Sequence, residues 1–175
     1  IKALYDGDMP LEFPENEIRP WINIRHLVEA GRYGGWALTD GKAVRSYALC
    51  AKAERSVLVD YLASPDPWKN QGYGSLLLAK LRSVVADADR LLIESEDPDV
   101  LCGAEAEMAR RRLGFYARNG FPETSVRVCL YHVEFRILSS EKGPERDANA
   151  RSGMDMLYRA ILPAALRPLI VRFHD

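Results

Sequence analysis

The sequence contains few of the residues that build disulfide frameworks or metal centres. Its three cysteines, Cys50, Cys102 and Cys129, include no Cys-x-x-Cys pair. Its three histidines are scattered and form no His-x-x-x-His or Cys/His cluster. An odd number of cysteines without a pattern argues against a disulfide framework and favours a reducing compartment. We therefore expect no metal site and a cytoplasmic location.

Long apolar runs and an excess of positive charge are also missing. No uninterrupted apolar stretch approaches the roughly 20 residues that cross a bilayer, and no signal-peptide pattern is visible. The formal net charge is −1, whereas chains that bind nucleic-acid phosphates usually carry a basic excess. We therefore expect neither a membrane nor a nucleic acid as a partner.

The composition is that of an ordinary globular domain. Of 175 residues, 47% are hydrophobic and 28% are charged, which suffices for one core. We expect a single domain over residues 1–175. Within it, 1–139 form the main body, 140–153 a polar connection, and 154–175 a C-terminal helix and last strand.

Hydrophobic periodicity predicts the order of helices and strands. Apolar residues at helical spacing predict helices over 21–30, 75–86, 104–119 and 154–165. Extended patterns predict strands over 36–39, 43–51, 56–63, 91–98, 125–130, 133–138 and 169–173. Asp40-Gly41 between the first two strands is a hairpin signal. An antiparallel start followed by strand–helix–strand units implies an α/β fold with a mixed sheet and helices on both faces.

The most informative segment joins the strand 56–63 to the helix that follows it. The connection carries Gly72, Tyr73 and Gly74. Glycine lets the backbone approach a ligand closely, and the first amides of a helix lack intrahelical partners. Together they predict an anion site suited to a pyrophosphate. Neither common phosphate-loop motif is complete, so a tight turn that binds nothing explains the glycines about as well.

Two blocks of sequence resemble the GNAT acetyltransferase superfamily. Residues 69–74, KNQGYG, are similar to its pyrophosphate loop, (Gln/Arg)-x-x-Gly-x-(Gly/Ala), with Lys69 where Gln or Arg is usual. Lys69 keeps the positive charge but lacks the planar fork of arginine. Residues 111–121, RRLGFYARNGF, resemble the final helix of the family. The resemblance covers about residues 1–139 and is that of a bacterial-type member.

This resemblance implies a fold and a cofactor. The fold is a mixed, mostly antiparallel central sheet whose two central parallel strands splay apart, and the cofactor is acetyl-CoA. The pantetheine arm is expected along the strand end at Leu62, Ala63 and Ser64. The pyrophosphate is expected on the loop and first helical turn, at Lys69, Asn70, Gln71, Gly72, Tyr73, Gly74 and Ser75.

The resemblance also implies a proton donor. Tyr116 resembles the tyrosine that protonates the departing thiolate in many members, because a phenol can donate a proton while uncharged. The alternative is an ordinary core tyrosine, since Tyr116 belongs to an amphipathic helix.

The general base is less clearly indicated. Some members carry a glutamate where this chain has Leu58. Strand alternation places Asp60 on the same face, so Asp60 could substitute. Glu94 and Glu96 on the next strand are rivals, and a water chain is a further alternative.

The sequence thus predicts an N-acetyltransferase that transfers the acetyl group from acetyl-CoA to a primary amine of a small molecule or peptide. No cysteine has a nucleophile setting, so direct attack is expected. Glu12, Glu15 and Glu17 could help to attract a cationic amine, although a soluble surface explains them equally well. The chain could form a homodimer. The alternatives are a non-catalytic acyl-CoA-binding or sensing module and an unrelated nucleotide-binding domain.

Overall fold

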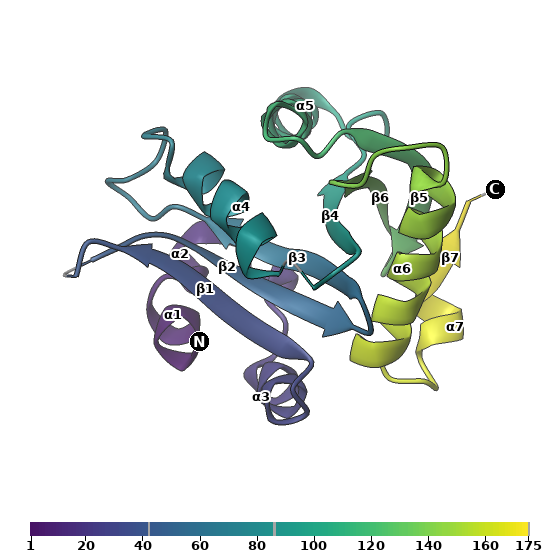
Figure 1. The fold of residues 1–175 in the computed structure, drawn as a ribbon, viewed down its shortest axis with the longest axis horizontal. Coiled ribbons are helices and arrows are strands. Elements are labelled where there is room, and N and C mark those ends of the chain that lie inside the picture. The colour runs from purple at the N-terminus through teal and green to yellow at the C-terminus, as the bar shows by residue number, and fades with distance from the viewer. Residues whose placement is uncertain (42, 86, 175) are drawn as a thin grey trace. The chain divides into compact units, whose positions relative to one another are not determined.

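A computed structural model describes residues 1–41, 43–85 and 87–174, with the side chain of residue 16 left aside. Its helices are α1 (Lys2–Gly7), α2 (Met9–Glu12), η1 (Glu15–Glu17, a 3-10 turn), α3 (Trp21–Glu29), α4 (Tyr73–Val84), α5 (Gly103–Arg118), α6 (Arg146–Ile161) and α7 (Arg167–Ile170). Its strands are β1 (Tyr33–Thr39), β2 (Val44–Ala53), β3 (Ser56–Ala63), β4 (Arg90–Glu96), β5 (Glu123–Leu130), β6 (Val133–Ser139) and β7 (Val171–Phe173) (Figure 1).

The strands form one seven-stranded sheet in the order β1-β2-β3-β4-β6-β5-β7. β1 and β2 pair as the expected antiparallel hairpin, with Tyr33 opposite Ala51. β4 with β6, β5 with β6 and β5 with β7 are also antiparallel. One pair in the sheet is parallel. The prediction of a mixed, mostly antiparallel sheet in an α/β fold is therefore confirmed, whereas the splay of its central strands stays a prediction.

The chain divides into two compact units, which are described separately. The first comprises Ile1–Ala51 and Val59–Val85. In it, α3 and α4 both pack on β1. Fully buried side chains from four different elements form its core: Met9, Ile24, Tyr47, Leu49, Leu78 and Leu81.

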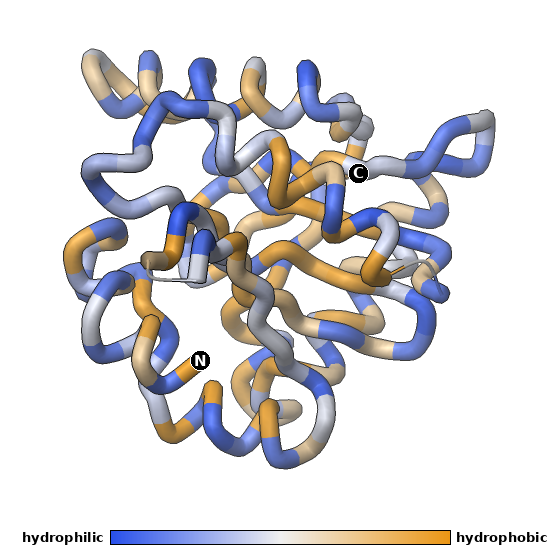
Figure 2. The backbone as a smooth tube through the Cα atoms, turned by 60° about the vertical axis from the view of Figure 1, so that its left-hand side comes forward, coloured by the Kyte–Doolittle hydropathy of each residue, from blue (hydrophilic) through white to orange (hydrophobic). Residues whose placement is uncertain are grey.

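The second unit comprises Lys52–Leu58 and Ala86–Asp175. In it, α6 lies along β4, β5 and β6, and α5 packs on β4 (Figure 1). Gly153 lets α6 approach the sheet, because a Cβ there would lie 2.9 Å from Leu92 and 3.0 Å from the Ser56 hydroxyl oxygen. In Figure 2 the helical segments alternate between blue and orange, as expected for helices with one buried and one exposed face.

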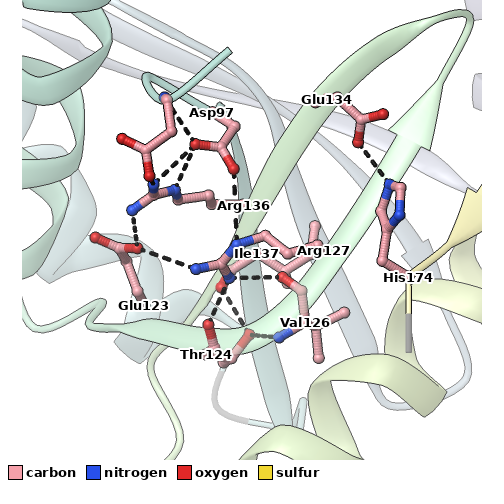
Figure 3. A network of polar contacts seen from close by, with 10 residues as sticks. Asp97, Glu123, Thr124, Val126, Arg127, Glu134, Arg136, Ile137 and His174 are labelled. Atoms are coloured by element: carbon pink, nitrogen blue, oxygen red, sulfur yellow. Dashed lines mark hydrogen bonds and ion pairs between the residues drawn. The ribbon is translucent and has the colours of Figure 1, made fainter.

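An ionic network joins two strands of the second unit, β5 and β6, to the segment that follows β4 (Figure 3). The Arg136 guanidinium on β6 contacts Asp97 at 2.8 Å and Glu123 at 2.9 Å, and it also bonds Asp99. Arg127 on β5 lies 3.8 Å from Asp97. Because the Arg136 side chain is only 15% exposed, these charges are screened less than surface pairs.

The C-terminal segment corrects two expectations. α6 begins at Arg146, so most of the expected polar connection 140–153 is helical. The first half of this helix is hard to see in the sequence because its buried positions carry small residues, Ala150 and Gly153. The expected strand over 169–173 is also wrong at its start, since Arg167–Ile170 form a helical turn with Pro168 in its first turn.

Two smaller points concern the other elements. α4 begins at Tyr73, two residues before the expected start. Lys42 lies outside the described residues. None of the described helices is long and apolar enough to span a membrane. The expected single-domain organisation stays a prediction.

Candidate functional site

The first turn of α4 presents its backbone amides without a side-chain cap. Gly72 is the residue before the helix and has φ = 85°, a left-handed conformation that favours glycine. Asn70 is left-handed as well, with φ = 60°. A Cβ at Gly72 would meet no atom within 4 Å, so the backbone is open there. Together with the helix dipole, these amides suit an anion such as a pyrophosphate.

The loop before α4 is held in shape by its own polar groups and by β2. The Trp68 amide donates to the Pro65 carbonyl at 2.7 Å, and the Gln71 side-chain amide donates to the Pro67 carbonyl at 2.7 Å. The Arg45 guanidinium carbon lies 3.2 Å from the centre of a Trp68 ring, which is a cation–π contact. Arg45, which the sequence did not single out, therefore supports the loop from outside it.

Lys69 points to carboxylates. Its ammonium nitrogen lies 3.0 Å from Glu12 and 3.2 Å from Asp66. Hydrogen bonds to Glu12 and Asp66 raise the pKa of Lys69, so the side chain stays charged. The ion pair with Glu12 connects the loop before α4 to α2.

The end of β3 carries the residues expected along the pantetheine arm. Leu62, Ala63 and Ser64 are partly exposed. The Ala63 carbonyl already accepts a hydrogen bond of 2.9 Å from the Ser46 hydroxyl on β2. A ligand strand would therefore use other groups of this segment.

Asp60 is enclosed by partners within the first unit. Its carboxylate accepts a hydrogen bond from the Tyr33 hydroxyl and lies 3.6 Å from the Arg19 guanidinium. Its side chain is 11% exposed and that of Arg19 is 17% exposed. Burial, reinforced by Asp60, raises the pKa of Tyr33, so the phenol remains a hydrogen-bond donor. These contacts favour a role for Asp60 in holding structure.

The neighbouring Tyr61 fixes the segment that contains Arg19. The Tyr61 hydroxyl donates to the Glu17 carbonyl at 2.8 Å and accepts from the Arg19 amide at 2.8 Å. Burial raises the pKa of Tyr61. Sequence reasoning missed Tyr33, Arg19 and Tyr61, and no spacing pattern joins residues so far apart in the chain.

Tyr116 belongs to α5, in the second unit. It is partly exposed, and among the described residues its hydroxyl has no hydrogen-bond partner. Desolvation raises the pKa of Tyr116, and the Arg112 guanidinium opposes that rise. The phenol is therefore held in its protonated form, which is the form that a proton donor needs.

Glu94 and Glu96 of β4 have different partners. The Tyr158 hydroxyl on α6 donates a hydrogen bond to Glu94. Glu96 lies 3.3 Å from the Arg112 guanidinium on α5. Tyr158 is the functional candidate that sequence reasoning missed. The helical pattern after residue 154 placed it in a helix but gave no sign of Glu94 as its partner.

The predicted site residues are divided between the two units. The cofactor candidates 62–64 and 69–75 and Asp60 belong to the first unit. Tyr116, Glu94 and Glu96 belong to the second. Over residues 1–41, 43–85 and 87–174, no group of three or more His, Cys, Asp or Glu side chains could hold a metal ion.

Comparison with known proteins identifies the fold. No protein-family profile and no curated protein sequence matches the chain. Solved structures do match it. A protein assigned to the GNAT acetyltransferase family from Bacteroides thetaiotaomicron is 17% identical, with a TM-score of 0.65 over 91% of this chain and 89% of that one.

Two further solved structures carry information on ligands. A GNAT family acetyltransferase from Elizabethkingia anophelis, solved with acetyl-CoA bound, is 12% identical, with a TM-score of 0.54 over 74% of this chain and 95% of that one. A spermidine N-acetyltransferase chimera from Vibrio cholerae and hSSAT is 7% identical, with a TM-score of 0.52 over 73% and 78%. At these identities the likeness establishes the fold alone, and the chain has the fold of GNAT acetyltransferases.

Proposed function

We propose, from the fold that this chain shares with GNAT acetyltransferases, that it is an N-acetyltransferase. It transfers an acetyl group from acetyl-CoA to a primary amine by direct attack. The observation that carries the proposal is the first turn of α4, where uncapped amides follow the left-handed Gly72. A pyrophosphate on those amides is the ligand that this geometry suits best.

The chain's own groups would hold the cofactor as follows. The backbone amides of residues 71–75 bind the pyrophosphate, and the strand end at 62–64 pairs with the pantetheine amides. Acetyl-CoA supplies an activated acetyl thioester. Arg45 and Trp68 keep the loop ordered, so little conformational entropy is lost when the pyrophosphate binds.

Tyr116 is the proposed proton donor and Glu94 the proposed general base. The raised pKa of Tyr116 keeps its phenol protonated at neutral pH. Glu94 is preferred to Asp60 because the Asp60 carboxylate already faces the Arg19 guanidinium and the Tyr33 hydroxyl. To accept a proton from a substrate amine, the Asp60 carboxylate would first have to leave these two partners.

Direct attack by the amine agrees with the state of the cysteines. Burial raises the pKa of Cys50, and desolvation with Glu134 raises the pKa of Cys129. A thiol with a raised pKa is seldom a thiolate and is therefore a poor nucleophile. A covalent acetyl-cysteine route through either residue is disfavoured.

The second candidate function is a non-catalytic acyl-CoA-binding or sensing module. The observation that favours it lies on β3, where Leu58 is buried and the only carboxylate, Asp60, is ion-paired. In such a module acetyl-CoA would bind without release of CoA in the presence of amines.

Thermal unfolding with acetyl-CoA, CoA, ATP and NAD tests the proposal. At about 100 times Kd a ligand adds about 2.7 kcal/mol of stability, which is a rise in Tm of roughly 5–10 °C for a chain of this size. A rise with acetyl-CoA and CoA alone supports the cofactor, and amine-dependent thiol release then separates enzyme from module. A rise with ATP or NAD instead, or no rise at all, overturns the proposal.

A matched pair of glycine variants locates the binding. Gly72→Val should abolish the rise in Tm, because a side chain would block the open backbone before α4. Gly31→Val is the control, since Gly31 also has positive φ and open space around it but follows α3. The proposal for this loop fails if both variants respond equally to acetyl-CoA.

A further inference from the structure

The carboxylate of Glu94, on β4, is held from α6. The Tyr158 hydroxyl donates a hydrogen bond to the Oε1 atom of Glu94. Tyr158 is 1% exposed, whereas Glu94 is partly exposed. The bond therefore ties a carboxylate that solvent can reach to a donor that lies in the protein interior.

α6 lies close enough to β4 for this contact because Gly153 has no side chain. A Cβ at Gly153 would lie 2.9 Å from Leu92. Leu92 and Glu94 are two residues apart on β4, so they share a face of the sheet. Two strand residues span about 6.6 Å and five helical residues about 7.5 Å, so the two contacts follow the same direction along the helix and the strand. The place of the Tyr158 phenol is thus set by the packing of the whole helix.

The ring of Tyr158 is packed as well. Its centre lies 6.0 Å from that of the Phe173 ring on β7, with an angle of 49° between the ring planes. Met154, Leu157 and Ile161 are buried on the same helix. A side chain that is locked by packing presents its hydroxyl at one place, and supporting residues of this kind hold a reactive group in its working geometry.

We propose that Tyr158 is a positioning residue for the acetyl transfer, and that its hydroxyl holds the Glu94 carboxylate ionised and in one orientation for the acceptor amine. The inference rests on the proposed acetyltransferase function, with Glu94 as the general base. In that reaction Glu94 takes a proton from the acceptor ammonium, the amine nitrogen bonds to the acetyl carbon, and the carbon–sulfur bond to CoA breaks. A phenol donates a hydrogen bond without losing its proton, so Tyr158 supports the base and takes no part in the transfer.

The pH dependence of kcat tests this role. Tyr158→Phe keeps the ring and removes the hydrogen bond, and its loss favours the protonated form of the carboxyl group. The acid limb of kcat should therefore move about one pH unit higher, since two or three such bonds lower a carboxyl pKa by about two units. At the pH optimum kcat should fall about tenfold, because the base is no longer oriented, while the Kd of acetyl-CoA changes less than twofold. An acid limb that stays in place overturns the inference.

The comparison isolates one hydrogen bond, because the ionisable groups around Glu94 are the same in both proteins. On β6 the apolar Ile137 lies opposite Glu94. The ionisable side chains that β4, α5 and α6 contribute to this region are Arg90, Glu96, Arg112, Asp155 and Arg159. None of them is changed by Tyr158→Phe, so a shifted acid limb reports the lost hydroxyl.

Two controls separate positioning from packing. Phe173→Leu removes the ring beside Tyr158 and keeps the hydroxyl, so it should leave the acid limb where it is in the wild type. A double-mutant cycle is the second control. Tyr158→Phe should lower turnover about tenfold in the wild type but less than twofold in Glu94→Gln, because the group that it positions is then absent. An equal loss in both backgrounds, or the same shift of the acid limb in Phe173→Leu, contradicts the proposal.

A variant that keeps both the ring and the hydroxyl guards against a folding defect in Tyr158→Phe. In Tyr158→3-fluorotyrosine the fluorine makes the phenol more acidic and hence a stronger hydrogen-bond donor. A stronger bond to the ionised carboxylate should move the acid limb to lower pH. No movement, or movement to higher pH, contradicts the proposal.

The two proposals fail in different experiments. An NMR titration of the Glu94 side-chain carbon needs no turnover, and isotope-labelled glutamate with Glu94→Gln for assignment makes that carbon visible. Its midpoint should lie about one pH unit higher in Tyr158→Phe than in the wild type, and equal midpoints overturn the inference. If the wild type releases no CoA with a panel of primary amines, the proposed function fails, whereas the titration still decides whether Tyr158 holds Glu94 ionised.

Discussion

The hydroxyl of Tyr158, on α6, donates a hydrogen bond to a carboxylate oxygen of Glu94, on β4. Tyr158 is 1% exposed whereas Glu94 is partly exposed, so the bond is part-buried. A buried hydrogen bond to a charged group is stronger than an exposed neutral one. α6 thus supplies a hydrogen-bond partner for one of the predicted catalytic carboxylates.

Tyr158→Phe should lower the free energy of unfolding by about 1.5–3 kcal/mol, because a part-buried carboxylate loses one charge-assisted hydrogen bond. Urea denaturation monitored by circular dichroism measures the change. Tyr131→Phe is the control, since Tyr131 is 52% exposed and its change should stay within about 0.5 kcal/mol. Equal stabilities of the two variants would show that the Glu94 contact contributes nothing.

Gly153→Ala should destabilise the protein by about 1–3 kcal/mol through overpacking. The usual effect of this change inside a helix is the opposite, a gain of about 1 kcal/mol. The reversal is expected because the new methyl group would lie 2.9 Å from Leu92 and 3.1 Å from Arg90. Gly114→Ala on α5 is the control, where the new methyl group would meet only the end of the flexible Arg118 side chain. Thermal unfolding of both variants checks the sign, and a stabilised Gly153→Ala would refute close packing of α6.

Local patterns in the sequence were sufficient for most of the elements. The hairpin around Asp40-Gly41, the buried strand before the glycine loop and the amphipathic helices over α4 and α5 all follow from residues that are close in the chain. The predicted helix over 154–165 found only the second half of α6, because the buried positions of its first half are Ala150 and Gly153, which carry almost no hydrophobic signal. Small residues are required there because the helix packs close to the sheet. That distance is a tertiary property, which the periodicity of hydrophobic residues does not reveal.

In the candidate site, too, local features could be predicted from the sequence and contacts between distant residues could not. The glycine loop could be predicted because its chemistry depends on backbone conformation within a few residues. The partners of Asp60 could not be, because Tyr33 and Arg19 reach it from distant parts of the chain. Strand alternation gives the face on which a carboxylate lies, but it does not identify the groups opposite.

Asp60→Asn and Glu94→Gln should have contrasting effects. Asp60→Asn removes the charge that offsets the largely buried Arg19, so it should cost about 3 kcal/mol of stability. When the folded Asp60→Asn variant is assayed, its turnover should fall only about twofold, because we propose Glu94 and not Asp60 as the general base. Glu94→Gln should lower turnover by about 100-fold or more, which is the contribution of a general base. Steady-state kinetics below the Tm of each variant distinguishes the roles, and the assignment is reversed if Asp60→Asn shows the larger loss of turnover.

Stability should fall steeply in alkaline solution. Burial raises the pKa values of Cys50, Tyr33, Tyr47 and Tyr61 in the folded state. The unfolded chain releases these protons first, near pH 8.5 for the thiol and about 10 for the phenols. The contribution of these protonated groups to the free energy of unfolding is therefore complete below the pKa values of the unfolded chain. It is lost as the pH rises toward the pKa values of the folded state. Each group should contribute about 1.4 kcal/mol per pH unit in that range. Denaturant titrations from about pH 8 to 11 should show this decrease in the free energy of unfolding. Tyr47→Phe should make the decrease smaller by the contribution of one phenol. A free energy of unfolding that does not change with pH would contradict burial of these groups.

Tyr116→Phe should lower turnover by about 100-fold while the Kd of acetyl-CoA changes less than twofold, because only the proton donor is removed. The pH profile adds an independent check. Desolvation raises the pKa of Tyr116 above the ordinary phenol value of 10, so the donor stays protonated as the pH rises. The rate should consequently show no alkaline loss due to this group below about pH 10. Phe115→Leu, a change at the aromatic neighbour whose ring centre lies 5.3 Å away, is the control for altered packing. If Phe115→Leu reduces turnover as much as Tyr116→Phe does, Tyr116 supports the helix without donating a proton.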